Sequence, residues 1–416
     1  MYEEGVAAIV NGKILTPLKS IEKGVVVFEN GKILAVGKKD KVAIPKDAKL
    51  IDASNKIVAP GFIDIHTHGG GGKSLMTTHY EDINDVAKFF ATCGTTSFLC
   101  TFMAPLTMDG VEIGLKHAEV SRIAIEKGTD GAEVLGIRLE GPYFSPKKPG
   151  AASPEYFRRP SIEEFEEVMR VSGGNVKIVD VAPEVEGALG FIREVSKRGI
   201  VNSIGHSFAT YDEVLAGIKA GLSHVTHTFN AMRELHHREP GVVGAALVRD
   251  ELTAELIADR FHVHPVAMKI LVRCKGTDKV ILITDSTQAA GLPTGEYEFM
   301  GRKVVIKDGM CFIPKPPTSS ALEGTPQAEE VTLAGSTATM NMGVRNIVKF
   351  VGLPMQEAIK MATLNAAERI GVDKQKGSLE VGKDADIIII DDDVNVYMTI
   401  IKGKVVYSTS TLPKGP

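Results

Sequence analysis

Two histidines separated by one residue are candidate metal ligands in the first part of this 416-residue chain. His66 and His68 follow the apolar run 57–65, which predicts a short β-strand. Side chains two positions apart in a strand face the same side, so both imidazoles would point to one place. Such a pair binds a metal only where other ligands converge on it, and otherwise it is two residues on one face of a strand. The rest of the chain must therefore supply the other ligands.

Residues of metal-ligand type recur where later apolar runs end. They are Glu140, His206, His227, His262 and Asp285. If these runs are parallel strands, their C-terminal ends meet at one edge of the sheet, and the side chains come together there. Imidazole and carboxylate ligands without thiolate suit Zn²⁺, and also Fe²⁺ or Mn²⁺. The pattern therefore predicts a divalent-metal site.

Asp285 ends the last of these runs and has two possible roles. Beside a bound metal its carboxylate could take a proton from water and pass it to a leaving group. Alternatively, it could cap the turn that continues through Ser286 and Thr287. The catalytic role is favoured, because it completes an arrangement of metal and base.

Strand-like and helix-like segments alternate from residue 57 to about residue 365, which is typical of βα units. Eight such units predict an α/β fold, a (β/α)8 TIM-like barrel. The predicted strands are 57–65, 96–102, 134–140, 176–181, 200–204, 223–226, 252–258 and 279–284.

Both chain ends contain short β-like runs instead. Asn11-Gly12 and Asn30-Gly31 separate the first of them, and Asn-Gly between such runs predicts hairpins. Neither end can bury a core alone, so we expect a small β-sandwich domain built from both termini. The predicted boundaries give residues 1–57 and 366–416 to this domain and 58–365 to the catalytic barrel.

Composition limits the function to a local site. The net charge is −4, with 44% hydrophobic and 24% charged residues, so no general field favours nucleic acid or a membrane surface. The start of the chain has no leader pattern, and no apolar run approaches the length of a membrane span. The four cysteines show no CxxC spacing, which fits a reducing compartment. We therefore expect a cytoplasmic protein.

Taken together, the motifs resemble those of the N-acetylglucosamine-6-phosphate deacetylases, a family of the amidohydrolase superfamily. The matching segments are 60–69 (PGFIDIHTHG), 139–142 (LEGP), 205–207 (GHS), 226–232 (THTFNAM), 238–241 (REPG), 257–263 (IADRFHV) and 284–286 (TDS). They occur in order from the first predicted strand to the last. The resemblance implies a barrel of the amidohydrolase type and a metal-dependent hydrolase that releases acetate and glucosamine 6-phosphate.

The resemblance also implies roles for individual residues. Glu140, His206 and His227 would hold the principal metal, His66 and His68 would support a second ion, and Asp285 would be the general base and acid. One or two ions per chain, zinc or iron, are therefore expected. The residues similar to the family's contacts with the amino sugar phosphate are Asn230, Ala231, Arg238 and His262. Arg238 would reach the substrate across the interface of a homodimer.

Two segments depart from the family pattern. Ala152 stands where a histidine or glutamine is expected, and the segment 314–330 is longer and more polar than expected. These departures keep another N-acyl substrate open, such as an N-acyl-D-amino acid, because fold and metal site do not fix the acyl acceptor. A barrel that binds a sugar phosphate without catalysis is a further alternative. The presence of Asp285 disfavours it, because binding needs no proton carrier.

Overall fold

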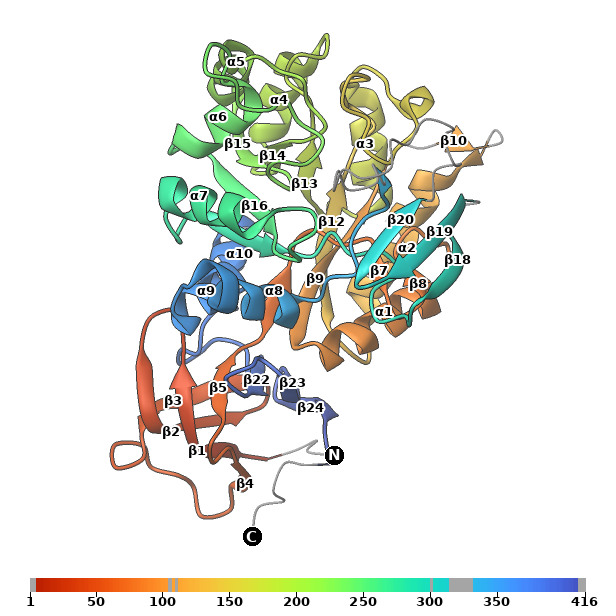
Figure 1. Cartoon of the computed structure of the whole chain (residues 1–416). Helices are drawn as coiled ribbons and strands as arrows, with labels where there is room; N and C mark the ends of the chain where they lie inside the picture. Colours follow the sequence, from red (N-terminus) through yellow and green to blue (C-terminus); the bar gives the residue numbers. More distant parts are fainter. Residues whose placement is uncertain (1–4, 104–106, 109–110, 300–301, 314–331, 411–416) are drawn as a thin grey trace.

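The structure, a computed structural model, describes residues 5–103, 107, 108, 111–299, 302–313 and 332–410. A barrel surrounded by helices lies on top of a β-sheet that contains both ends of the described chain (Figure 1). The predicted fold class, a parallel α/β barrel with a small β domain from the termini, is confirmed.

Eight parallel strands form the barrel wall. Their side chains are almost all buried, which explains the nearly continuous apolar runs in the sequence. In order around the wall they are β6 (Phe62–Asp64), β9 (Thr95–Phe102), β12 (Glu133–Leu139), β13 (Val176–Asp180), β14 (Val201–Ile204), β15 (Leu222–Val225), β16 (Thr253–Ile257) and β17 (Val280–Ile283).

Helices cover the outside of the wall, and their ends follow local sequence rules. Thr210 and Glu213, for example, form a capping box at the start of α5, and Gly221 ends this helix at a φ of 119°. The helices are α1 (Tyr80–Thr92), α2 (Ile113–Lys127), α3 (Ile162–Val171), α4 (Ala188–Ser196), α5 (Tyr211–Ala220), α6 (Gly241–Val248), α7 (Pro265–Lys275), α8 (Met340–Asn346), α9 (Met355–Met361) and α10 (Leu364–Arg369), with the short turns η1 (Pro154–Tyr156) and η2 (Ile347–Val351). No helix in the described ranges has both the length and the apolar character needed to cross a membrane.

The first and last strands of the barrel are joined just beyond their ends. The backbone N–H of Asp285 donates to the carbonyl of His66 at 2.8 Å, and that of His68 donates to the carbonyl of Ser286 at 2.7 Å. These bonds fix the two segments that carry candidate chemistry directly against each other. At the opposite end of the barrel, α10 closes the apolar interior. Two of its residues, Ala366 and Ala367, pack there together with Ile370, which directly follows the helix.

The prediction of one strand over 57–65 is wrong. The run divides into β5 (Ile57–Pro60), which pairs with the terminal sheet, and β6, which belongs to the barrel. Gly61 lies between them, and a Cβ there would come within 2.1 Å of the Thr96 side chain, so the close approach requires glycine. His66 and His68 consequently follow a strand instead of lying on one, because β6 ends at Asp64.

The terminal sheet joins strands from both ends of the chain. Asn30-Gly31 forms the predicted hairpin between β2 and β3, whereas the hairpin predicted at Asn11-Gly12 is wrong. There β1 continues through the pair with an irregular register, and Asn11 takes a φ of 66°. The boundaries at 57 and 366 stay predictions. The strands are β1 (Ala7–Leu15), β2 (Ser20–Glu29), β3 (Lys32–Lys38), β4 (Lys49–Asp52), β5, β22 (Ile387–Ile390), β23 (Val396–Ile401) and β24 (Lys404–Ser408).

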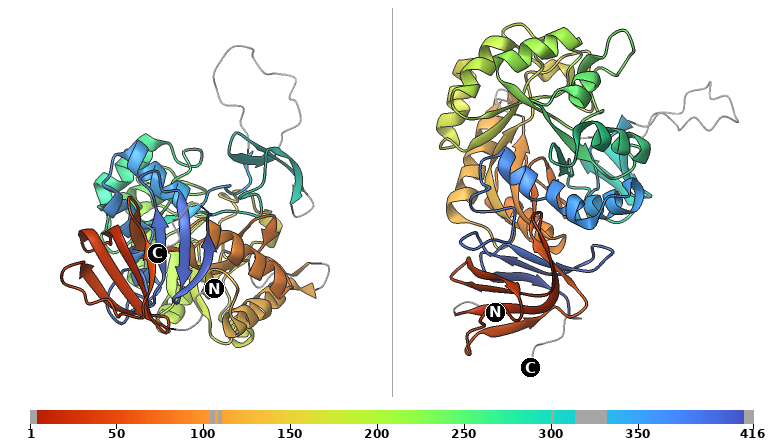
Figure 2. Two further views of the ribbon diagram at one scale, coloured as in Figure 1. Left: turned by 90° about the horizontal axis from the view of Figure 1, so that it is seen from below. Right: turned by 90° about the vertical axis from the view of Figure 1, so that its left-hand side faces the viewer.

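A small antiparallel sheet between β17 and α8 stands out from the side of the barrel (Figure 2). Our predictions from the sequence contained no sheet at this place. Segment 314–330 falls within this region but lies outside the described residues. The remaining strands are β18 (Gly295–Phe299), β19 (Arg302–Lys307), β20 (Met310–Ile313) and β21 (Thr332–Leu333) in this sheet, and the short pairs β7 (Gly69–Gly70) with β8 (Lys73–Ser74) and β10 (Thr107–Met108) with β11 (Val111–Glu112).

Candidate metal centre

Two carboxylates and four histidines converge at the C-terminal end of the barrel. Each comes from the segment directly after a strand, where the side chains of neighbouring strands meet. We call these residues the metal cluster: His66, His68, Glu140, His206, His227 and Asp285. The structure thus brings together all five predicted ligands and the predicted proton carrier.

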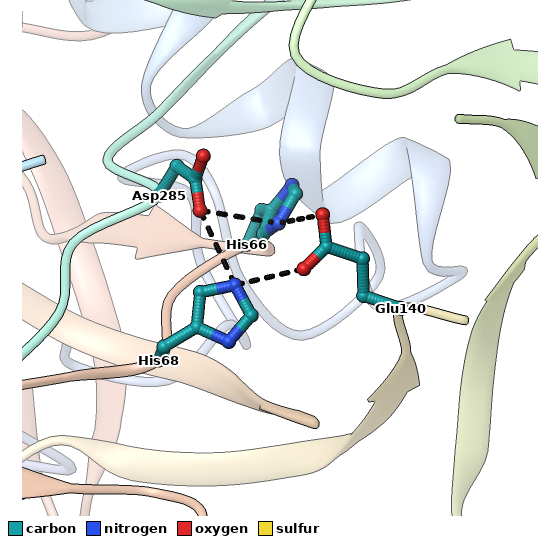
Figure 3. Close-up of side chains that lie close together, drawn as sticks. All are labelled: His66, His68, Glu140 and Asp285. Atoms are coloured by element: carbon teal, nitrogen blue, oxygen red, sulfur yellow. Dashed lines mark ion pairs between the residues drawn. The ribbon is translucent and has the colours of Figure 1, made fainter. Parts of the chain in front are cut away.

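One half of the metal cluster consists of His66, His68, Glu140 and Asp285 (Figure 3). His68 Nε2 lies 2.9 Å from Glu140 Oε2 and 3.2 Å from Asp285 Oδ1. His66 Nε2 lies 3.4 Å from Glu140 Oε1 and 3.5 Å from Asp285 Oδ1. Four potential ligand atoms therefore face one another across a gap that a small cation can fill.

The other half consists of His206 and His227 with the same Glu140. His227 Nε2 lies 3.2 Å from Glu140 Oε1, and His206 Nε2 lies 3.5 Å from the same oxygen. The two imidazole nitrogens are 3.3 Å apart. Because Glu140 is shared, the metal cluster could hold one ion or two neighbouring ions.

Three residues of the metal cluster have unusual backbone conformations. His206, His227 and Asp285 take φ values of 48°, 26° and 47°, in the left-handed region that non-glycine residues seldom adopt. Each such residue costs about 1–3 kcal/mol and persists only where its surroundings enforce it. In all three the chain turns immediately after a strand, which directs the side chain over the end of the barrel.

The loop that follows Glu140 holds the His206 ring. His206 Nδ1 lies 3.0 Å from the carbonyl of Lys148, and the ring stacks on Phe144 at a centroid distance of 4.3 Å. With the Nδ1 proton donated to Lys148, Nε2 is left to act as a ligand. A Cβ at Gly150 would come within 2.8 Å of the ring, so glycine is required for this close approach.

Charges within the metal cluster shift the pKa values of its members. Burial disfavours the charged form of His68, but Glu140 and Asp285 outweigh it and raise its pKa to about 9. Burial likewise opposes ionisation of Glu140, yet the adjacent His66 and His68 hold its pKa well below the usual range. The carboxylates therefore require positive charge beside them, which imidazolium groups or a metal ion can supply.

The residues present fit a divalent cation. The buried Nε2 of His66 has no hydrogen-bond partner in the described part of the chain, although it faces Glu140 and Asp285. No lysine or arginine among the described residues forms an ion pair with either carboxylate. An uncapped imidazole nitrogen beside carboxylates is suited to Zn²⁺, Fe²⁺ or Mn²⁺.

A buried charged layer lies beneath the metal cluster, and our predictions from the sequence missed it. Glu255, Arg138 and Asp180 are fully buried inside the barrel, where Arg138 pairs with both carboxylates. Each is a charged residue directly flanked by apolar residues in the sequence, and this was the available signal. Charges at such positions are rare unless they are paired.

The predicted substrate residues Asn230, Ala231 and His262 each lie in a segment that follows a barrel strand. Asn230 and Ala231 follow His227 closely, and Asn230 donates to the His227 carbonyl at 3.2 Å. His262 Nδ1 lies 2.6 Å from Asp259 Oδ2, and the charges of Asp259 and Asp285 outweigh burial and raise the His262 pKa.

Arg238 and Ala152 do not bring a polar side chain to the metal cluster. Arg238 is exposed and faces His237 at 2.9 Å, so the structure does not bring it to the cluster of its own chain. Ala152 is half-buried, and its backbone N–H donates to the carbonyl of Pro149. Its side chain has no polar atom to offer a substrate.

Comparisons with known proteins point to one family. The model of the Amidohydrolase family matches residues 57–406. N-acetylglucosamine-6-phosphate deacetylase of Vibrio furnissii is 39% identical over 85% of this chain and 84% of its own. N-acetylgalactosamine-6-phosphate deacetylase of Escherichia coli O157:H7 is 38% identical over 86% and 90%.

A solved structure is similar over nearly the whole chain. It is a mutant N-acetyl-D-glucosamine-6-phosphate deacetylase from Mycobacterium smegmatis in complex with N-acetyl-D-glucosamine-6-phosphate. Its TM-score is 0.85 at 30% identity, and the match covers 97% of this chain and 100% of the other.

Proposed function

The chain belongs to the amidohydrolase family, and on this premise we propose that it hydrolyses N-acetylglucosamine 6-phosphate to acetate and glucosamine 6-phosphate. The observation that carries the proposal is the convergence of the metal cluster at one end of the barrel. The enzymes among its relatives support an amino sugar phosphate over an N-acyl-D-amino acid. The full set of ligands together with Asp285 likewise supports catalysis over binding alone.

Glu140, His206 and His227 would hold the principal metal, and His66 and His68 would support a second ion. When bound, a divalent cation supplies a Lewis acid that polarises the amide carbonyl and lowers the pKa of water. The imidazole ligands of the metal cluster favour zinc or iron among the divalent ions.

Asp285 acts as the proton carrier. Its carboxylate faces His66 and His68 at the centre of the metal cluster, where it takes a proton from the attacking water. It then delivers this proton to the nitrogen of the departing amino sugar, because an amide anion is too basic to leave unprotonated. His262, whose Nδ1 is held by Asp259, donates to the acetyl carbonyl or to the sugar.

Asn230 and Ala231 bind the sugar phosphate through backbone groups, and Arg238 reaches it across a homodimer interface. The exposure of Arg238 supports this assignment, because its guanidinium is free to meet a neighbouring subunit. Leu235 and Val248, which precede and follow Arg238 in the sequence, are 55% and 64% exposed, and exposed apolar side chains suit a subunit interface. A cytoplasmic location stays a prediction.

Acetate release by metal-reconstituted protein tests the function. The substrates are N-acetylglucosamine 6-phosphate, its galactosamine epimer, unphosphorylated N-acetylglucosamine and an N-acetyl-D-amino acid. We expect the glucosamine phosphate to give the highest kcat/KM and chelator-treated protein to be inactive. The epimer is included because a relative acting on it is almost equally similar to this chain. Preference for the N-acetyl-D-amino acid would overturn the proposal.

A further inference from the structure

We infer that Glu255 is a positioning residue that prepares His66 and His227 for metal binding, an inference that rests on the proposed metal site. Glu255 lies on β16 and is fully buried. Its Oε2 lies 2.9 Å from His66 Nδ1 and accepts the backbone N–H of His227, also at 2.9 Å. One carboxylate oxygen thus contacts both halves of the metal cluster.

The first contact sets the tautomer of His66. Arg138 pairs with Glu255 and keeps it ionised, and an ionised carboxylate can only accept hydrogen bonds. Neutral His66 must therefore carry its proton on Nδ1. Its Nε2 then presents a lone pair toward Glu140 and Asp285, and a ligand requires this state.

The second contact holds the strained turn at His227. The φ of 26° at this residue lies in the left-handed region, and the hydrogen bond from its N–H to Glu255 fixes the turn. In this conformation the His227 ring points back over the barrel, with Nε2 at 3.2 Å from Glu140. The same oxygen therefore aligns a ligand from β6 with one from β15.

Neutralising Arg138 does not by itself require Glu255. Arg138 donates two hydrogen bonds to Asp180, from Nε to Oδ2 at 3.1 Å and from Nη2 to Oδ1 at 3.0 Å. Asp180 contacts no histidine of the metal cluster in the described structure. The two carboxylates thus share one partner, but only Glu255 also contacts the ligands, which makes Asp180 a matched control.

Glu255→Gln separates the two roles. If the new NH₂ group faces Arg138, two hydrogen-bond donors oppose each other. If it faces His66, Nδ1 must become the acceptor and the proton moves to Nε2, which removes the lone pair needed for the metal. We expect an affinity for Co²⁺ about 10–100-fold lower than in the wild type.

Titration of the metal-free, full-length protein with Co²⁺ alone tests this inference, with visible absorption as the readout. We expect Glu255→Gln to bind weakly with an altered spectrum, whereas Asp180→Asn keeps the wild-type affinity and spectrum. Unchanged binding by Glu255→Gln would overturn the positioning role, whereas a wild type that binds no Co²⁺ would overturn the metal site itself.

Glu255→Asp covers the case in which the glutamine variant does not fold. It keeps the negative charge for Arg138 but shortens the side chain by one methylene, which withdraws the carboxylate from His66. We expect the same loss of Co²⁺ affinity in a folded protein. Wild-type affinity in this variant would also overturn the inference.

Discussion

Two groups of carboxylates among the described residues have the spacing of a metal site, yet they differ in the positive groups that neutralise them. The first is Glu140 and Asp285 with the histidines of the metal cluster. The second, here called the junction cluster, consists of Glu133, Asp384 and Asp386 where the barrel meets the terminal sheet. Inside the junction cluster, Lys376 Nζ lies 2.6 Å from Asp386, 2.7 Å from Glu133 and 3.1 Å from Asp384.

The difference shows how a structural cluster can be told from a functional one. Lys376 is only 5% exposed and supplies a cation that belongs to the chain, so the junction cluster needs no ion from solution. Glu140 and Asp285 pair only with histidines in the described part of the chain. Convergent carboxylates therefore indicate a metal where imidazoles accompany them and no lysine or arginine does.

The largest expected effect comes from Glu140→Gln, which removes the carboxylate shared by both halves of the metal cluster. A bound cation contributes several kcal/mol to the transition state, so kcat/KM should fall by about 10⁴-fold, together with the metal content. Elemental analysis and acetate release measure the two losses. Glu133→Gln in the junction cluster is the control and should keep both. Full metal content in Glu140→Gln would contradict the assignment of Glu140 as a metal ligand.

The next prediction concerns the stability that the junction cluster gives to the fold. Lys376→Met removes the buried cation of the junction cluster and leaves the buried Asp386 without an ion-pair partner among the described residues, which should lower the free energy of unfolding by about 3–5 kcal/mol. Metal content and turnover of the folded fraction should stay unchanged. Lys402→Met is the control, because Lys402 also pairs with Glu133 at 2.7 Å but is half exposed, and we expect a loss below about 1 kcal/mol. Urea titration measures both.

The stability loss in Lys376→Met should depend on pH. Burial raises the pKa of both Glu133 and Asp384, but nearby lysines outweigh it, namely Lys376 with Lys402 at Glu133 and Lys32 with Lys376 at Asp384, so the folded-state pKa values are lowered. Their contribution is therefore present above the ordinary carboxyl pKa and is lost as pH falls through the lowered values. At Asp386 burial outweighs Lys376 and raises the pKa, so the contribution of Asp386 to stability changes with pH in the opposite direction.

Without Lys376 all three carboxyls bind protons more readily. The difference in unfolding free energy between wild type and Lys376→Met should therefore narrow as pH falls below about 5. A constant gap in urea titrations between pH 7 and pH 4 would exclude this electrostatic origin.

The sequence was informative wherever chemistry followed a strand. The eight strands and the six residues of the metal cluster could be placed because each ligand ends an apolar run, and the barrel brings those ends together. Local signals were weaker guides to the backbone. Asn11-Gly12 has the composition of a hairpin, but pairing with β2 on one side and β4 and β5 on the other carries β1 straight through it.

Contacts between distant segments could not be predicted from one sequence. Lys376 lies in a loop, and its partner Glu133 is far away along the chain, so nothing in the local pattern indicates the junction cluster. In the sequence, Glu255 is a single charged residue in a predicted strand. Its role becomes visible only in the folded barrel, where β16 lies beside β15 and Arg138 forms an ion pair with Glu255. Tertiary packing decides both, through the pairing of buried charges.

Asp285→Asn should have a smaller effect than Glu140→Gln and leave the metal in place. The amide keeps the shape and an oxygen, but it cannot take up a proton, so kcat should fall by about 10²–10³-fold. Within the metal cluster this separates a proton carrier from a ligand. Metal analysis and kcat measured on the same preparation decide the role. Near-normal turnover would show that Asp285 is not the proton carrier and would favour its alternative role, capping the turn at Ser286.

Arg238 differs from the cations of the buried clusters, and its substitution should have the smallest effect. It is exposed, and no carboxylate of the described residues forms an ion pair with it, so its charge is available to a ligand. A guanidinium can grip phosphate with two parallel hydrogen bonds, and charged bonds of this kind contribute roughly 1.5–3 kcal/mol. Arg238→Ala should therefore raise KM for N-acetylglucosamine 6-phosphate by about 10–100-fold and barely change hydrolysis of the unphosphorylated sugar. Arg238→Lys, which keeps the charge but not the planar fork, should be intermediate.

Mixed subunits test whether Arg238 acts across a dimer interface. Chains carrying Asp285→Asn lack the proton carrier but keep the arginine, and chains carrying Arg238→Ala have the opposite defect. If the arginine acts in trans, a mixed dimer contains one site with native Asp285 and native Arg238, so part of the low-KM activity should return on mixing. Activity no greater than the sum of the separate variants would place Arg238 outside the partner's site.

Equal wild-type kcat/KM for the phosphorylated and unphosphorylated sugars would mean that Arg238 binds no substrate phosphate. With Ala152 also lacking a polar contact, an N-acyl-amino acid would then become the better substrate to test.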